Sequence, residues 1–331
     1  MDENRTIHFI KFYKMLRLKI VYSLLLLLLL ISCKKDFFDS VVEVEVPEHR
    51  PQLTVAAHFY DQGDVYIVDV GHSVGILDTT AVDAVNDATV ELLEDDQVLF
   101  NSFKLRESLD ATNNLYYTED GINFAPEKTY TLKVNSPKYG QLSGTQTMPT
   151  RVLIENATYE EDGAVDRWGE RGDEISIQFT DPLNEENYYE VTVYPELLVT
   201  TADSSFVVEN YWAWTTPVDP LLEEVADKLM LSDAGLDGTT YTLQVATFFR
   251  EQLGYEQTNG GWLEGAEVEL TAINITLLSV SKDYYIFQKS FASYQDNQDN
   301  FFAEPSNVYE NIEDGIGIFT LSTGDSFKIE F

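Results

Sequence analysis

Residues 88–100 read ATVELLEDDQVLF, and this stretch indicates the fold class of the chain. Two short apolar runs flank the acidic turn Glu94-Asp95-Asp96, which is the pattern of a β-hairpin. A strand with one buried face alternates apolar and polar side chains, because successive residues point to opposite faces of the sheet. The stretch therefore predicts two antiparallel strands with a mainly β fold around them.

Similar short alternations, separated by turn residues, continue on both sides of this hairpin. We predict further strands at 53–59, 65–70, 115–118, 129–134 and 141–147. About seven strands in roughly 100 residues is the size of an immunoglobulin-like β-sandwich. Because Met148-Pro149-Thr150 ends the pattern, the first predicted domain spans residues 51–149.

A second β-sandwich domain is predicted for residues 150–331. Its expected strands are 152–159, 175–179, 188–194, 206–214, 241–246, 268–278, 316–321 and 326–331, with a turn at Thr323-Gly324-Asp325 between the last two. Two helical insertions are expected, at 220–231 and at 282–294. The second carries Tyr284, Phe287, Phe291 and Tyr294 at helical spacing. We interpret this aromatic stripe as core packing rather than a ligand platform.

The N-terminal region has the features of a secretory signal. Residues 20–31 are apolar and uncharged, they follow the basic residues Arg17 and Lys19, and they end at Ser32-Cys33. An apolar run of about a dozen residues is short for a membrane span, which needs roughly 20, so a cleaved signal is favoured over a transmembrane helix. Leu30-Ile31-Ser32-Cys33 is similar to the bacterial lipobox, whose cysteine is acylated.

We therefore predict a lipoprotein signal peptide at residues 1–32 and lipid attachment at Cys33. The polar and acidic residues 33–50 are expected to form a flexible tether. The alternatives are an ordinary signal that happens to contain this cysteine, and a start at Met15.

Charge and cysteine content exclude several functional classes. The chain has 21 Lys+Arg and 57 Asp+Glu, and without residues 1–32 its net charge is −39. Such a surface repels phosphate groups, so nucleic-acid binding and electrostatic attachment to anionic lipids are disfavoured. Cys33 is the sole cysteine. Its acylation would leave no thiol for a disulfide, a metal site or nucleophilic catalysis.

Four segments in a fixed order carry a family resemblance. They are AVNDATVELLEDD (84–96), KTYTLKVNSPKYGQLSGTQTMP (128–149), FTDPLNEENYYEVTVY (179–194) and SKDYYIFQKSFASYQDNQDNFFAEPSNVYENIEDGIGIFTL (281–321). Together they resemble a Bacteroidota lipoprotein family called domain of unknown function 4249. The resemblance implies an outer-membrane lipoprotein encoded beside a TonB-dependent transporter, and it implies no catalytic residues. Asp36 and Asp39, close after Cys33, match in part the acidic signal for export to the cell surface rather than the periplasmic face.

Tryptophan and tyrosine residues supply the candidate ligand-binding groups. In the predicted strand 206–214, Trp212 and Trp214 lie on one face and Tyr211 on the other. Trp168 lies in the polar loop 166–172. Such rings could stack on a sugar ring or another flat ligand. The alternative is that they fill the sandwich core or an interface.

Other residues give weaker chemical signals. Asp233 and Asp237, on the turn 233–238, offer oxygen ligands for calcium, although their spacing differs from that of an EF-hand loop. No other cofactor is expected. Carboxylates are so abundant that a pair at glycosidase spacing carries no information.

Three functions remain open after these exclusions. The favoured function is that of a non-enzymatic outer-membrane lipoprotein that assists a TonB-dependent transporter or binds its ligand. The alternatives are a calcium-stabilised surface adhesion or structural module, and a carboxylate-based glycan hydrolase.

Overall fold

The stretch 88–100 forms the predicted hairpin, in which β3 (Thr89–Glu94) pairs antiparallel with β4 (Gln97–Phe100). The turn residues Asp95 and Asp96 both have positive φ, 43° and 67°. This is the conformation of a type I′ turn, whose twist matches that of the two strands. The computed structural model describes residues 48–75, 77–78, 83–106, 114–258, 263–298 and 306–331.

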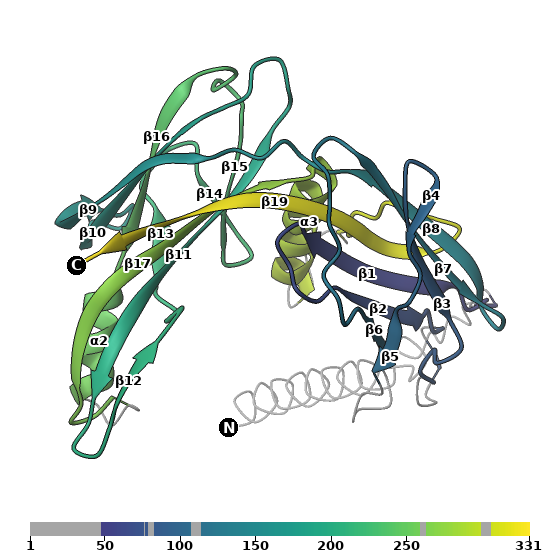
Figure 1. Ribbon diagram of the computed structural model, residues 1–331, viewed down its shortest axis with the longest axis horizontal. Coiled ribbons are helices and arrows are strands. Elements are labelled where there is room, and N and C mark those ends of the chain that lie inside the picture. Colours follow the sequence, from purple (N-terminus) through teal and green to yellow (C-terminus); the bar gives the residue numbers. More distant parts are fainter. Residues whose placement is uncertain (1–47, 76, 79–82, 107–113, 259–262, 299–305) are drawn as a thin grey trace, which may run out of the picture. The chain divides into compact units, whose positions relative to one another are not determined.

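Every described element lies in residues 49–331, which form one compact unit. Within the described residues, strands dominate and form three sheets (Figure 1). The ten-stranded sheet has the order β14 (Glu223–Val225), β15 (Lys228–Ser232), β11 (Tyr188–Thr200), β17 (Glu267–Val280), β19 (Ile316–Glu330), β1 (Leu53–Tyr60), β2 (Ile67–His72), β6 (Asn114–Tyr117) and β5 (Lys104–Arg106), with β12 (Ser205–Val208) paired to β11.

The other two sheets are smaller. The four-stranded sheet has the order β13 (Thr215–Pro217), β16 (Thr240–Thr247), β10 (Arg171–Thr180) and β9 (Ile154–Val165). The five-stranded sheet has the order β18 (Ile312–Glu313), β8 (Gly140–Thr147), β7 (Thr129–Ser136), β3 and β4. The two described helices are α2 (Phe249–Thr258) and α3 (Lys282–Gln298), and neither is long and apolar enough to cross a membrane.

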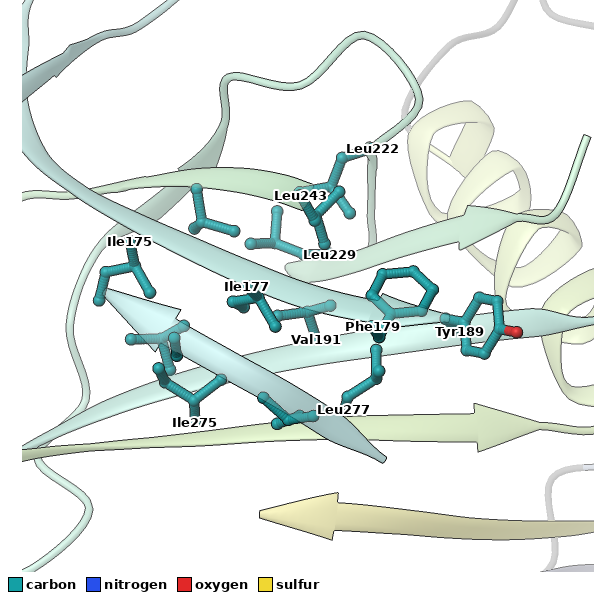
Figure 2. Packing of buried hydrophobic residues seen from close by; sticks show 14 of the residues in the cluster. Ile175, Ile177, Phe179, Tyr189, Val191, Leu222, Leu229, Leu243, Ile275 and Leu277 are labelled. Atoms are coloured by element: carbon teal, nitrogen blue, oxygen red, sulfur yellow. The ribbon is translucent and has the colours of Figure 1, made fainter. Parts of the chain in front are cut away.

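Each small sheet packs on a different part of the ten-stranded sheet, and a hydrophobic cluster fills each interface. One cluster contains side chains of β1, β2, β3, β7 and β8, among them Phe59, Leu92 and Tyr130. The other contains side chains of β10, β11, β16 and β17. Figure 2 shows Ile177, Phe179, Val191 and Leu277 of this second cluster gathered between the strands. The expectation of a mainly β fold of packed sheets is thus confirmed.

Strand β19 connects the two clusters (Figure 1). Its residues 316–322 pair in parallel with β1, and its residues 322–330 pair antiparallel with β17. Phe319 and Leu321 belong to the first cluster, whereas Phe327 packs against the second. The predicted boundary at residues 149–150 falls between the clusters, and the division into two domains stays a prediction.

The start of β19 is held by a polar network with α3. Asn311 mimics a strand residue, because its Oδ1 accepts from the Phe319 N–H at 2.9 Å and its Nδ2 donates to the Phe319 carbonyl at 2.7 Å. The same Nδ2 donates to Asp283 at 2.8 Å, and Asp283 also accepts from the Tyr309 hydroxyl at 2.8 Å. These residues all belong to the last segment of the family resemblance.

Helix α3 confirms the prediction for residues 282–294. Its aromatic stripe is only partly core, because Tyr284 is buried whereas Tyr294 is exposed. The predicted helix at 220–231 is wrong. That segment forms the hairpin β14–β15, whose turn residues Ala226 and Asp227 have φ of 48° and 63°. A two-residue I′ turn satisfies the backbone there, which the spacing of the apolar residues does not reveal.

The predicted turn at Thr323-Gly324-Asp325 is also wrong. Strand β19 runs through it without interruption, with Gly324 opposite Leu278 of β17. A Cβ atom on Gly324 would lie 2.6 Å from the Leu278 side chain. The glycine therefore permits close packing within a strand, a role that sequence alone does not separate from a turn.

Candidate functional site

A hollow of about 630 Å³ lies where the β9–β10 turn, the segment before β13 and helix α2 meet. We call it the aromatic groove. Its lining residues are Asp166, Trp168, Glu170, Arg171, Trp214, Thr216, Glu224, Phe248, Glu251, Gln252 and Tyr255. Three of its rings are largely exposed, at 63% for Trp168, 65% for Trp214 and 66% for Tyr255. Exposed rings gathered around one hollow are typical of a ligand site.

The β9–β10 turn presents Trp168. The buried Asp166 Oδ1 accepts hydrogen bonds from the backbone N–H of Trp168 at 2.9 Å and of Glu170 at 2.8 Å. Gly169 has φ of +89°, and its N–H donates to the Asp166 carbonyl at 3.0 Å. Because this turn satisfies its own backbone, the indole of Trp168 projects from a firmly held support.

Trp214 is held by helix α2 rather than by a sheet. The Gln252 amide donates to the Trp212 carbonyl and accepts from the Trp214 N–H, both at 3.2 Å. The N–H of Phe248 donates to the Trp214 carbonyl at 2.9 Å. Phe248, Gln252 and Tyr255 recur at helical spacing, so one face of the helix both supports Trp214 and lines the groove.

Helix α2 is in turn anchored to β10 by an ion pair. Asp173 is 1% exposed, and its Oδ2 accepts from Arg250 Nε at 2.7 Å and from the Tyr159 hydroxyl at 2.9 Å. Its Oδ1 accepts from Arg250 Nη2 and from the Asp162 N–H, the latter at 3.0 Å. Hydrogen bonding to Asp173 raises the pKa of Arg250. The buried carboxylate thereby fixes the helix that carries Glu251, Gln252 and Tyr255 of the groove.

Negative charge predominates around the rings. The lining residues include the four carboxylates Asp166, Glu170, Glu224 and Glu251 and one guanidinium, that of Arg171. Just outside the lining, Arg167 lies over the Trp168 ring with its Cζ 4.1 Å from the centroid, and its Nη2 donates to Glu224 at 2.7 Å. Among the described residues, the side chains of Glu170 and Glu251 form no ion pair. The groove can therefore offer aromatic faces and carboxylate oxygens to a ligand.

The structure brings only part of the predicted ligand-binding set together. Trp168 and Trp214 line the aromatic groove, whereas Trp212 lines a separate hollow of about 130 Å³ with Glu190 and Lys228. Tyr211 is buried, and burial raises its pKa. The predicted strand at 206–214 is wrong beyond β12, because residues 209–214 form a turn and an irregular segment, although the alternation of exposed and buried side chains persists there.

Sequence reasoning missed the contribution of α2, which was not among the expected helices. The spacing of Phe248, Glu251, Gln252 and Tyr255 is the signal that could have revealed it. Gly254 in the middle of the segment weakens that signal.

Asp233 and Asp237 hold a neighbouring loop. Asp233 Oδ2 accepts from the Asn187 N–H at 2.9 Å, and Asp237 Oδ1 accepts from the Asn184 N–H at 2.6 Å. Within the described ranges, no group of three or more His, Cys, Asp or Glu side chains could hold a metal ion. A calcium ion at these two residues stays a prediction. The other predicted site, Cys33, lies outside the described residues.

Comparison with known proteins identifies one family. A search of curated proteins found no match. The model of one protein family, described as Domain of unknown function (DUF4249), matches residues 39–328. This match includes every strand of the three sheets except the last two residues of β19, and it covers both described helices and the aromatic groove. The chain therefore belongs to the DUF4249 family.

Proposed function

We propose that this protein is a non-enzymatic outer-membrane lipoprotein that captures a ligand in the aromatic groove and assists a TonB-dependent transporter. The observation that carries the proposal is the gathering of Trp168, Trp214 and Tyr255, all largely exposed, around one hollow. Large exposed rings on one surface are costly to leave in water unless they meet a partner. Such a surface is suited to capturing a ligand.

The exposed rings can supply the affinity that capture needs. Covering about 100 Å² of apolar surface on each ring contributes about 2.5 kcal/mol at ~25 cal/mol per Å². Three rings therefore offer about 7 kcal/mol, from which the entropy lost on association, at least about 4 kcal/mol, is subtracted. The result is weak and reversible binding, which suits a protein that hands its ligand to a transporter.

Binding is a better account of the groove than catalysis. Asp166 is occupied by two backbone N–H groups, and Glu224 is paired with Arg167. The other two carboxylates, Glu170 and Glu251, are exposed to solvent. A glycosidase needs one carboxyl group that stays protonated near neutral pH, and burial is the usual cause of such a raised pKa.

Attachment through a lipid on Cys33 is part of the same proposal. The net charge of −36 opposes binding to an anionic membrane surface, so a covalent lipid is the remaining means of attachment that the sequence offers. The tether to residue 50 would then hold the groove near the membrane. The cell surface, rather than the periplasmic face, is the proposed location.

The ligand test compares three forms of the protein. Wild type, the double variant Trp168→Ala/Trp214→Ala and the control Trp212→Ala are purified and each is dialysed to equilibrium against a small-molecule extract of the native host. The compounds enriched on the protein side of the membrane are identified by mass spectrometry. We expect one or more compounds on wild type and Trp212→Ala that are missing from the double variant. The same compounds on all three forms would contradict ligand capture by the groove.

The partner test is separate from the ligand test. Extraction in a mild non-ionic detergent should co-purify a β-barrel transporter with the wild-type protein. Recovery of the protein alone in several detergents would contradict the accessory role, while leaving ligand capture in place.

A further inference from the structure

We infer that the aromatic groove selects a ligand bearing a guanidinium group, an inference that rests on the proposed function and specifies its ligand class. The groove combines aromatic faces with an excess of carboxylates, and this pairing distinguishes a cation site from a site for neutral rings. A cation is attracted to the negative face of an indole or phenol ring and to carboxylates at the same time.

The molecule already contains one guanidinium bound in this way. Arg167 lies over Trp168 at 4.1 Å from the ring centroid and donates to Glu224 at 2.7 Å. Its side chain is 54% exposed, so the arrangement forms at the mouth of the groove and not in the core. A flat guanidinium stacks on a flat ring and still reaches a carboxylate at its edge.

The surroundings of Trp214 repeat these elements, but no cation of the described residues lies over this ring. Trp214 is 65% exposed, and within the described residues no Lys or Arg lies over its ring. Glu251 lies on the helix face that supports Trp214, and neither it nor Glu170 has an ion-pair partner among the described residues. A ligand guanidinium on Trp214 would find these carboxylates as Arg167 finds Glu224.

Charge balance favours a cation over an anion or a neutral sugar. Four carboxylates and one guanidinium line the groove, and adding Arg167 still leaves two negative charges in excess. The whole chain, at a net −36, attracts cations from a distance. A neutral sugar could stack on the rings and donate hydroxyl hydrogen bonds to the carboxylates, but it carries no charge to balance this excess.

A matched pair of probes tests whether the guanidinium group itself is recognised. The probes are the blocked tripeptide Ala-Arg-Ala and the same peptide with citrulline, which has nearly the same shape and no charge. Agmatine serves as a guanidinium without a peptide, and maltohexaose as a neutral glycan. Binding to the full-length protein, kept in a polyoxyethylene detergent that carries neither sugar nor cation, is measured by calorimetry and tryptophan fluorescence.

We expect the arginine peptide to bind at least tenfold more tightly than the citrulline peptide, and to weaken several-fold when sodium chloride rises from 50 to 500 mM. Agmatine that binds as well as the arginine peptide would identify the guanidinium alone as the recognised group. Much weaker binding of agmatine would assign the site to arginine within a peptide.

Two variants locate the charge that is recognised. Glu251→Gln should weaken the binding of the arginine peptide several-fold and leave that of the citrulline peptide unchanged. Glu269→Gln, an equal charge change at an exposed position of β17, should alter neither. Both positions are exposed, so the fold should tolerate both changes. Melting temperatures of the two variants equal to that of wild type will show that the fold is intact.

Two results would overturn the inference. Equal affinity for the two peptides, or no binding of either at millimolar concentration, would exclude guanidinium selection. Maltohexaose binding that is lost in the Trp168→Ala/Trp214→Ala variant would then show that ligand capture stands while the ligand class is wrong. A failed proposed function looks different, because the bound compounds would be the same on wild type and on that double variant.

Discussion

The ion pair between Asp173 and Arg250 should be the most sensitive point in the support of the aromatic groove. We consider the isosteric change Asp173→Asn, which removes the charge and replaces one carboxylate oxygen by an NH₂ group. Each carboxylate oxygen accepts one hydrogen bond from Arg250 and one from another donor, which is Tyr159 for Oδ2 and the Asp162 N–H for Oδ1. If the NH₂ group takes the place of Oδ1, the bonds from Arg250 Nη2 and from the Asp162 N–H are both lost. If it takes the place of Oδ2, the bond from Arg250 Nε is lost, whereas the Tyr159 hydroxyl can rotate to accept from the NH₂ group.

The cost follows from the kinds of bond that are lost. A hydrogen bond to a charged group contributes about 1.5–3 kcal/mol, and a neutral one about 0.5–1.5 kcal/mol. The change removes at least one bond from Arg250 to the charged carboxylate and leaves the remaining bonds with a neutral acceptor, at a site where Asp173 is 1% exposed and solvent cannot replace what is lost. We expect the free energy of unfolding to fall by about 2–4 kcal/mol, which is a large part of a typical 5–15 kcal/mol.

Urea denaturation at pH 7, followed by circular dichroism and tryptophan fluorescence, measures this loss. The matched control is Asp162→Asn, because Asp162 also contacts Arg250, at 3.0 Å, but its side chain is 64% exposed. Asparagine tolerates the φ of +52° at that position, and exposed ion pairs contribute little, so the control should change stability by less than about 1 kcal/mol. Equal stability of Asp173→Asn and Asp162→Asn would refute the reasoning.

The remaining predictions concern other parts of the chain. Desolvation and Lys228 lower the pKa of His58 from 6.5 to about 4. As the pH falls, the unfolded chain therefore binds a proton at His58 before the folded protein does. The stability that neutral His58 contributes above pH 6.5 is lost as the pH falls toward 4, by about 1 kcal/mol after allowance for the exposure of the residue. The difference in free energy of unfolding between wild type and His58→Gln should therefore depend on pH, and a constant difference would contradict this. Gly317→Ala should prevent folding in expression trials, because the added Cβ would lie 1.8 Å from the Val55 carbonyl oxygen. Gly140→Ala, at a position with φ of +94° and open space around it, should lower the free energy of unfolding by only about 1–2 kcal/mol. Cys33→Ser should move the protein from the membrane fraction to the soluble fraction, and unchanged membrane association would contradict the lipid anchor.

The pattern of the first hairpin shows which features can be predicted locally. Residues 88–100 contain both the apolar alternation and the acidic turn, so the sequence predicts β3 and β4 within a residue or two. Helix α3 is likewise visible in its own aromatic spacing. The hairpin at 223–232 could not be predicted from its own residues. Its apolar residues fit both a helix and two short strands, and the I′ turn at Ala226-Asp227 lacks the usual glycine or asparagine.

The candidate site, too, could be predicted only in part from the sequence. The sequence singled out Trp168 as a ring in a polar loop and Trp214 as a ring on one face of a predicted strand, and both line the groove. It also grouped Trp214 with Trp212, which the structure places in a different hollow. Tyr255 was not foreseen, because helix α2, whose spacing signal is weakened by Gly254, was not among the expected helices.

The sequence by itself determined the mainly β class, the acidic surface and the alternation that buries one face of each strand, because these depend on composition and on neighbours along the chain. The tertiary structure alone decided that β19 pairs with both β1 and β17, and that α2 is fixed to β10 by Arg250 and Asp173, 77 residues apart. Such pairings depend on the packing of many distant side chains at once. The aromatic groove exists only because that packing brings four separate segments to one place.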